Sequence, residues 1–315
     1  MNAPRRIDPT GTQVHLRREG GSGEVTAQLA QVGAALRALT VGGVDVVARY
    51  PQGTTPPFAS GIVLVPWPNR VRDGRWTHVP PGGQGDPADQ QLDLTEPSRG
   101  NAIHGLLRNT GYDIDASGDR ATLSATVYPQ HGYPFALDTS VAYALTDDGI
   151  EVTHELVNVG ERDAPVAIGA HPFLCIGGVD TADLVLTVPA ETWFEVDDRM
   201  LPIAEHPVRG AVDLRGGVRV ADADLDMGFG SLRRDADGLA RTTLAAPDGR
   251  VVTLWQDADF EYVQAFRTDA YPGHPLAVAV EPMTAPADAF NSGRGVRWLA
   301  PGERWQARWG ISLSA

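Results

Sequence analysis

Hydrophobic and polar residues alternate over many short segments of the chain, and glycine, proline and aspartate separate these segments. The clearest case spans residues 141–156, where alternating arms on both sides of Asp147-Asp148-Gly149 predict a β-hairpin. Further turns between strands are expected at three pairs of residues: Gly42–Gly43, Asp73–Gly74 and Asp248–Gly249.

Helical periodicity is scarce, because no long segment repeats apolar residues at helical spacing. The last segment, "ERWQARWGISL", instead sets Trp305, Ala307, Trp309 and Ile311 on one face of a strand. Many short strands separated by turns predict an all-β fold, a large sandwich of antiparallel sheets with few short helices. We expect residues 1–315 to form a single domain, and the polar segment 79–91, rich in proline and glycine, to be a loop.

Composition narrows the classes of partner and the compartment. The formal net charge is -14, which argues against nucleic acid or an anionic membrane as a partner. No segment approaches the ~20 apolar residues of a membrane helix, and the first residues lack the apolar core of a secretory signal. Cys175 is the single cysteine and is predicted to be a buried, inert thiol. These features indicate a cytoplasmic protein, and the oligomeric state stays unknown.

Two ionisable residues stand at the ends of apolar strands. The stretch "PLAVAVEPMTAPADAFNSG" begins as a buried strand and reaches Glu281, which Pro282 follows directly. A carboxylate in that position is costly unless it is paired or used in chemistry. His171 occupies the same kind of place, after the apolar run "APVAIGA" and before Pro172. Either residue alone could be structural, but together they offer a base and a titratable acid.

Four more polar residues follow strands or lie in corners rich in glycine. Asn69 and Arg70 follow "GIVLVPWP", His104 precedes a glycine, and Asp226 lies among apolar residues. A surface arginine, a core histidine and a capping aspartate are the plain alternatives. As a set, these donors and acceptors suit a neutral polyol. Nearby aromatic residues could cover the apolar face of a sugar ring, although most are expected in the core: Trp67, Phe173 and Phe290.

Other chemistries fit these residues less well. The chain has no G-x-S-x-G nucleophile elbow, no P-loop and no G-x-G-x-x-G dinucleotide motif. His104, His171 and Glu281 could form a two-histidine, one-carboxylate metal site, but they lack the short spacing common in metal motifs, so no metal is expected. A glycosidase would use Asp226 with Glu281 as its two carboxylates, which would leave both histidines without a function.

Six motifs in one order resemble a known family. They are "PWPNRVRDGRW", "NAIHG", "HGYPFAL", "GAHPF", "LDMGF" and "VEPMTAPADAFNSG", and from about residue 30 onward the chain resembles the aldose 1-epimerases, or galactose mutarotases. The resemblance implies the family's large β-sandwich and no cofactor. It implies that Glu281 is the general base for the anomeric hydroxyl and that His171 is the general acid for the ring oxygen. It assigns sugar binding to Arg70, His104 and Asp226, with Asp224 as the fallback for the last; Asn69 is counted with them.

Elementary acid–base chemistry agrees with these roles. Opening a hemiacetal needs one proton removed and another delivered, and reference pKa values of about 4.3 for Glu and 6.5 for His suit that pair. Activity should then fall in acid as Glu281 protonates and in alkali as His171 loses its proton. The leading interpretation is a 1-epimerase of a free hexose such as glucose or galactose. Two alternatives stay open, a hexose-6-phosphate 1-epimerase that uses Arg72, Arg75 and Arg108, and a sugar-binding module without catalysis.

Overall fold

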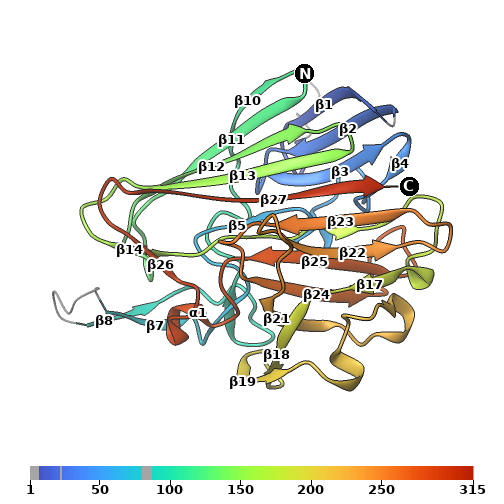
Figure 1. Ribbon diagram of the computed structural model, residues 1–315. Helices are drawn as coiled ribbons and strands as arrows, with labels where there is room; N and C mark the ends of the chain where they lie inside the picture. Colours follow the sequence, from blue (N-terminus) through green and yellow to red (C-terminus); the bar gives the residue numbers. More distant parts are fainter. Residues whose placement is uncertain (1–6, 22, 80–86, 315) are drawn as a thin grey trace, which may run out of the picture.

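The computed structural model describes residues 7–21, 23–79 and 87–314, and strands dominate this part of the chain (Figure 1). The predicted all-β fold of antiparallel sheets is therefore confirmed. Within the described residues, α-helix is limited to the four residues of α1 (Ala289–Ser292), and the other helical turns are short 3-10 turns. The same residues contain no helix that is long and apolar enough to cross a membrane.

Two large sheets form the body of the fold. The nine-stranded sheet contains, in spatial order, β10 (Asp113–Ser117), β11 (Arg120–Val127), β12 (Leu137–Leu145), β13 (Gly149–Asn158), β27 (Arg304–Ser314), β23 (Val251–Gln256), β22 (Ala240–Ala245), β17 (Val185–Thr187) and β20 (Val218–Arg219). The eight-stranded sheet contains β19 (Pro202–Pro207), β18 (Ala190–Val196), β21 (Asp226–Leu232), β24 (Tyr262–Thr268), β25 (Ala277–Met283), β15 (Gly169–Ala170) and β5 (Val63–Leu64), with β16 (Phe173–Leu174) also paired to β25.

Smaller sheets complete the structure. A four-stranded sheet is formed by β1 (Gln13–Gly20), β2 (Gly23–Ala30), β3 (Ala35–Val41) and β4 (Val44–Asp45). Three pairs of short strands are β6 (Arg70–Arg72) with β9 (Asn101–Ile103), β7 (Arg75–His78) with β8 (Ala88–Gln91), and β14 (Ala164–Val166) with β26 (Arg297–Leu299).

The core lies between the two large sheets. The last strand, β27, alternates as the sequence predicts, and its residues Trp305, Ala307, Trp309 and Ile311 are all buried. They belong to one hydrophobic cluster with side chains of the eight-stranded sheet, among them Val263 of β24. In Figure 1, β22, β23 and β27 lie against β24 and β25. Because this apolar layer is buried, the side chains on the opposite face of β24 and β25 point away from the core.

The predicted turns are all found, although the turn at Asp73–Gly74 does not join a hairpin. β12 and β13 form the expected hairpin, as do β3 with β4 and β22 with β23. The chain also turns at Asp73–Gly74, but the strands on either side pair elsewhere, β6 with β9 and β7 with β8. The Leu92 N–H, from a distant segment, donates to the Gly74 carbonyl at 2.7 Å at this turn.

The loop expected over residues 79–91 is partly wrong. Ala88–Gln91 form β8, while residues 80–86 lie outside the described part of the chain. Polar cross-strand contacts hold β8, since Thr77 Oγ1 donates to Asp89 Oδ1 at 2.9 Å and Arg75 Nε donates to Gln91 Oε1 at 2.9 Å. Because its cross-strand contacts are polar, β8 lacks the hydrophobic alternation by which a strand is recognised in a sequence.

Cys175 follows β16 and is buried, as predicted. Its thiol donates to the Asp45 carbonyl oxygen at 3.5 Å, and burial raises its pKa to about 12. A thiol that keeps its proton at neutral pH is a poor nucleophile.

Candidate active site

One face of the eight-stranded sheet carries the centre of the site. In the register of the sheet, Gln264 of β24 lies opposite Glu281 of β25, and Asp226 of β21 lies opposite Phe266 of β24. Residues directly opposite one another share a face, and so do residues two apart on one strand. The four side chains therefore project from the same face, away from the apolar core.

His171 meets Glu281 at this face. It follows β15, and its backbone is fixed on both sides, because its N–H donates to the Ile62 carbonyl at 3.1 Å and its carbonyl accepts from Gly61 at 2.8 Å. His171 Nε2 lies 3.3 Å from Glu281 Oε1, and the two side chains are 6% and 3% exposed. The ring of Phe173 stacks against the imidazole with centroids 5.5 Å apart. The two residues thus form one buried pair, although Glu281 lies within β25, which continues to Met283, and not at its end as expected.

Asn69 and His104 enter the site from neighbouring loops. Both have left-handed backbones, with φ of 53° and 63°, and the His104 N–H donates to the Asn69 carbonyl at 2.9 Å. Such conformations are strained for residues other than glycine and gather at functional sites. Gly105 allows the expected close approach, since a Cβ there would lie 2.0 Å from the Val65 carbonyl oxygen. The His104 ring comes within 5.4 Å of the His171 ring, centroid to centroid.

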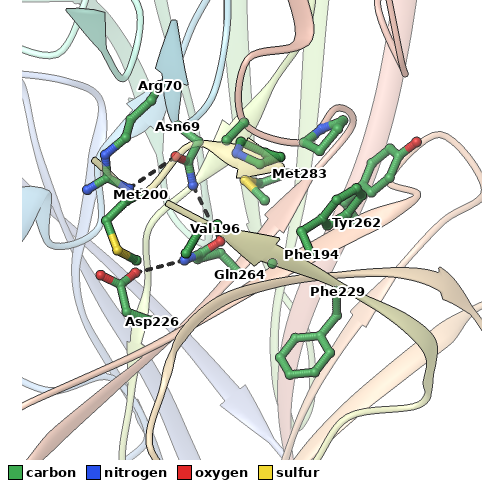
Figure 2. Close-up of a pocket in the computed structure, with 14 residues that line it drawn as sticks. Asn69, Arg70, Phe194, Val196, Met200, Asp226, Phe229, Tyr262, Gln264 and Met283 are labelled. Carbon is green, nitrogen blue, oxygen red and sulfur yellow. Dashed lines mark hydrogen bonds between the residues drawn. The ribbon is translucent and has the colours of Figure 1, made fainter. Parts of the chain in front are cut away.

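A chain of polar contacts links the remaining predicted residues (Figure 2). Arg70 donates to both carboxylate oxygens of Glu96, at 2.8 and 2.9 Å, and its third nitrogen donates to Asn69 Oδ1 at 3.4 Å. Asn69 Nδ2 donates to Gln264 Oε1 at 3.4 Å. Gln264 Nε2 then donates to Asp226 Oδ1 at 2.9 Å. These hydrogen bonds connect the Arg70 guanidinium with the Asp226 carboxylate through Asn69 and Gln264.

All six sequence-predicted residues line one pocket of about 320 Å³. Figure 2 shows a second, much smaller cavity of about 10 Å³ that shares Asn69, Arg70, Asp226 and Gln264 with it and is otherwise mainly apolar. The larger pocket has room for a monosaccharide, and its lining combines charge, amide, imidazole and aromatic groups: Pro56, Phe58, Ala59, Asn69, Arg70, Thr95, Glu96, Ile103, His104, Arg108, His171, Asp226, Gln264, Phe266 and Glu281.

Burial shifts both members of the central pair toward their neutral forms. Burial, and then the charge of Asp226, raise the pKa of Glu281 well above its usual value, with Arg70 acting in the opposite direction. Burial, with smaller effects of Arg108 and Arg70, lowers the pKa of His171 to about 3. Both shifts disfavour the ionised forms, so burial opposes a charged Glu281–His171 pair.

The pKa values of two other pocket residues are also shifted toward the neutral form. Burial, followed by the neighbouring His171, lowers the pKa of His104 well below its usual value. Burial raises the pKa of Asp226, although Arg70 and the hydrogen bond from Gln264 oppose this shift. Perturbed groups gathered in one pocket are typical of functional sites.

The aromatic part of the pocket differs from the expectation. Trp67 and Phe290 pack against each other in the core, with ring centroids 5.5 Å apart, and neither lines the pocket. Phe173 lies behind His171. The aromatic rings that do line the pocket are Phe58 and Phe266, whose centroids are 5.7 Å apart.

Sequence reasoning also missed Gln264 and Glu96. Gln264 had a signal, because it interrupts the apolar run "YVQAF" as Glu281 interrupts its own apolar run. Glu96 lies in the polar stretch "LTEPSRGN", where composition does not single out one residue. Its pairing with Arg70 depends on how distant segments fold together. Asp224, the fallback for Asp226, is exposed and does not line the pocket.

A metal site has no preformed geometry here. Among the residues that the structure describes, no three His, Cys, Asp or Glu side chains are arranged to hold a metal ion. His104, His171 and Glu281 lie near one another, but they meet as an imidazole pair beside a carboxylate.

Comparisons with known proteins agree on one family. The model of the family described as aldose 1-epimerase matches residues 18–312. A curated protein of Escherichia coli, the uncharacterized protein YihR, is 31% identical over 286 residues, which are 90% of this chain and 88% of that protein.

Solved structures show the same fold. A GalM/aldose epimerase homologue from C. elegans superposes with a TM-score of 0.80 at 16% identity, over 96% of this chain and 99% of that one. The galactose 1-epimerase of Lactobacillus acidophilus superposes with a TM-score of 0.73 at 18% identity, over 96% of this chain and 98% of that one.

Proposed function

Because the chain belongs to the aldose 1-epimerase family, we propose that it interconverts the α and β anomers of a free hexose such as glucose or galactose. The observation that carries this proposal is the buried contact of 3.3 Å between His171 Nε2 and Glu281 Oε1, at the base of a pocket lined with hydrogen-bonding groups. Such a pair can remove one proton and deliver another within a single site.

In the proposed reaction, the Glu281 carboxylate takes the proton of the C1 hydroxyl while the His171 imidazolium donates its proton to the ring oxygen. The bond between C1 and the ring oxygen breaks, and C1 becomes an aldehyde carbon. Rotation about the C1–C2 bond then presents the other face of the aldehyde. The hydroxyl that ring opening released adds to C1 and gives its proton to His171. Glu281 protonates the aldehyde oxygen, which becomes the new anomeric hydroxyl. No proton is gained or lost overall.

Sugar binding is assigned to the residues that surround this pair. Arg70, Asn69 and His104 would donate or accept hydrogen bonds at ring hydroxyls, and Asp226 would accept from a hydroxyl on the opposite side. Phe58, which is 42% exposed, would cover the apolar face of the ring. Asp226 and Gln264 already share a hydrogen bond of 2.9 Å, which fixes the carboxylate before sugar arrives.

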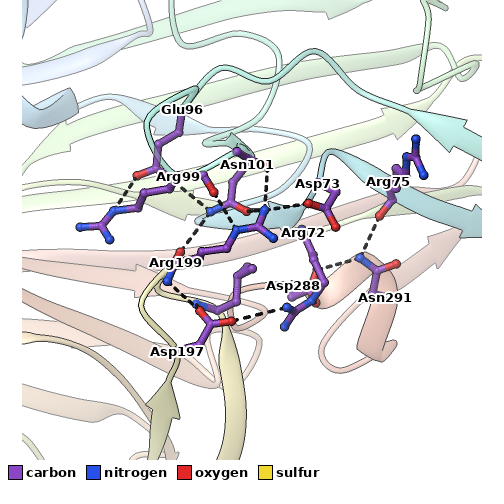
Figure 3. Close-up of polar contacts among 12 residues, drawn as sticks. Arg72, Asp73, Arg75, Glu96, Arg99, Asn101, Asp197, Arg199, Asp288 and Asn291 are labelled. Carbon is purple, nitrogen blue, oxygen red and sulfur yellow. Dashed lines mark hydrogen bonds and ion pairs between the residues drawn. The ribbon is translucent and has the colours of Figure 1, made fainter.

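A phosphorylated hexose is the main alternative substrate, and two of its three expected ligands are engaged elsewhere. Figure 3 shows Arg72 beside Asp197 and Asp288. Arg72 is bonded to Asp288, and Arg75 donates to Gln91 on the strand pair β7–β8. Neither lines the pocket. A phosphate dianion usually recruits several cations, so these contacts favour a sugar without phosphate.

A sugar-binding module is the alternative from another class, and polarimetry separates it from an enzyme. A freshly dissolved pure anomer of glucose or galactose should reach equilibrium faster with protein than in buffer. Glu281→Gln keeps the size of the side chain but removes the proton acceptor, so kcat should fall severely while sugar affinity stays within about tenfold. His171→Asn should lower kcat by ~10²–10⁴-fold. Binding of sugar with no rate above buffer would establish the binding module instead.

The proposal includes a cytoplasmic location and a small-molecule partner. The single cysteine is a buried thiol, which suits a reducing compartment. The net charge of -14 disfavours nucleic acid and anionic membrane as partners.

A further inference from the structure

The tip of the β18–β19 hairpin, residues 197–201, adjoins the site. It is a closed turn, because Asp197 Oδ1 accepts from the backbone N–H groups of Arg199 and Leu201, both at 2.9 Å. Leu201 has no exposed surface and anchors the turn. Met200, which lies between them in the chain, lines the small cavity beside the main pocket (Figure 2). The tip is therefore a fixed part of the wall of the site.

The guanidinium of Arg199 holds the turn that carries Glu96. Its Nε donates to the Arg99 carbonyl at 2.8 Å, and its Nη2 donates to the Gly100 carbonyl at 2.9 Å. Glu96 and Asn101 close this turn, since the backbone N–H of each donates to the carbonyl of the other, at 2.9 and 3.2 Å. Arg199 therefore bonds to the segment between Glu96 and Asn101 from a position outside the lining of the pocket.

The side chain of Asn101 connects Arg199 with the Glu96 carboxylate (Figure 3). Asn101 Oδ1 accepts from Arg199 Nη2 at 3.1 Å, and Asn101 Nδ2 donates to the Arg199 carbonyl at 3.1 Å. The same Nδ2 donates to Glu96 Oε2 at 3.3 Å, and this oxygen also accepts from Arg70 Nε at 2.8 Å. Asn101 has no exposed surface. The four side chains thus form one chain of hydrogen bonds, in which removal of one member leaves buried polar groups unsatisfied.

From these contacts we propose that Arg199 is a positioning residue for sugar binding, which acts through Asn101 and Glu96 to hold the Arg70 guanidinium in the pocket. This inference rests on the proposed 1-epimerase function and adds to its site a residue from outside the pocket. A long arginine side chain loses much rotamer freedom when it is held in one geometry. Glu96 can impose that geometry on Arg70 only if its own carboxylate is fixed, and Arg199 fixes it through Asn101.

An arginine that holds a turn elsewhere in the fold offers a matched control. Arg234 is half-buried, as Arg199 is, and it also donates to backbone carbonyls, to Asp257 at 2.8 Å and to Phe260 at 3.1 Å. None of these three residues lines the pocket. Loss of either arginine should lower the free energy of unfolding, whereas loss of Arg199 alone should change sugar binding.

The experiment measures kcat and KM by polarimetry for glucose or galactose, whichever the wild type anomerises faster. Arg199→Gln should raise KM by about fivefold with less than about a twofold change in kcat, because binding weakens while the Glu281–His171 pair is untouched. Arg234→Gln should leave both constants at their wild-type values. If Arg199→Gln does not fold, Arg199→Lys takes its place with the same expected result, since lysine keeps the charge but lacks the planar fork of donors.

A double variant tests the route through Glu96. In Glu96→Gln the carboxylate that Arg199 orients is absent, so the addition of Arg199→Gln should raise KM by less than about twofold further. Effects on KM that multiply in the double variant, an unchanged KM in Arg199→Gln, or an equal rise in Arg234→Gln would each overturn the inference. A wild type that does not accelerate anomerisation would reject the 1-epimerase function itself, which is a different result from an active wild type whose KM does not depend on Arg199.

Discussion

His171 Nε2 lies 3.3 Å from Glu281 Oε1, and both side chains are almost completely buried. Burial raises the pKa of Glu281 and lowers that of His171, whereas the proposed reaction begins with Glu281 ionised and His171 protonated. The ionised pair and the neutral pair contain the same number of protons. Transfer of one proton across the contact interconverts them, so the pair can reach the ionised form without a proton from solvent.

The first prediction is a pH profile that differs from the one expected from reference pKa values. With unshifted groups, kcat/KM would fall above pH ~6.5 as His171 lost its proton. Burial lowers the pKa of His171 to about 3 and raises that of Glu281. The singly protonated pair should therefore span a wider pH range than the reference values allow, and kcat/KM should fall in acid when a second proton binds and in alkali when the shared proton leaves. A loss of activity centred near pH 6.5 would contradict the coupled pair.

A second prediction concerns Glu96, which acts through Arg70 as a positioning residue. The two side chains are 16% and 11% exposed and form a bidentate pair. Glu96→Gln removes the charge and loosens the guanidinium, so KM should rise by about tenfold, with a smaller change in kcat.

The pH profile of Glu96→Gln distinguishes positioning from general loss of structure. Without the Glu96 charge, Arg70 acts more strongly on Glu281, and the alkaline limb should move to lower pH. Glu155→Gln is the matched control, because it removes an acid from the ion pair with Arg304, outside the pocket. An alkaline limb that stays in place while the rate falls would mean that Glu96 serves folding alone.

How much of this site the sequence could reveal depends on the kind of contact. Glu281 and His171 were predictable because each follows directly on an apolar run and precedes a proline, which is a local pattern. The pairing of Gln264 with Glu281, and of Arg70 with Glu96, depends on register between segments distant in the chain. Phe58 could not be predicted for the same reason, since it reaches the pocket from a 3-10 turn, η1 (Pro57–Ala59), and lies beside Phe266.

The same difference between local patterns and long-range contacts applies to the fold. Alternation predicted β12, β13 and β27, but it could not show that β27, at the end of the chain, pairs with β13 at its middle. Long-range strand order is set by packing of the whole apolar layer rather than by any one segment.

The third prediction is that activity does not depend on a metal ion. The proton transfers require the Glu281–His171 pair alone. Activity measured after dialysis against a strong chelator should equal that of the untreated protein. Loss of activity that one divalent ion restores would reject this prediction, and His104 would then be the first additional ligand to test.

The last prediction concerns stability in acid and rests on His154, a histidine outside the pocket. It lies on β13 with no exposed surface, and its Nε2 accepts a hydrogen bond of 2.8 Å from the Trp309 indole. Burial lowers its pKa to about 3. A group whose pKa is lowered by folding stabilises the protein above its unfolded pKa of about 6.5, and that contribution is lost as the pH falls toward the folded value.

Replacement of His154 by Gln removes this titration while keeping a possible acceptor for Trp309. Between pH 7 and pH 5 the wild type should lose about 2 kcal/mol more free energy of unfolding than His154→Gln, because the unfolded wild type gains a proton that the folded form refuses. Denaturant unfolding at the two pH values measures the difference, and the other histidines cancel between the two proteins. His131→Gln, at an exposed position, should lose as much free energy as the wild type. Equal losses for the wild type and His154→Gln would show that His154 is protonated in the folded protein, with its contact to Trp309 broken.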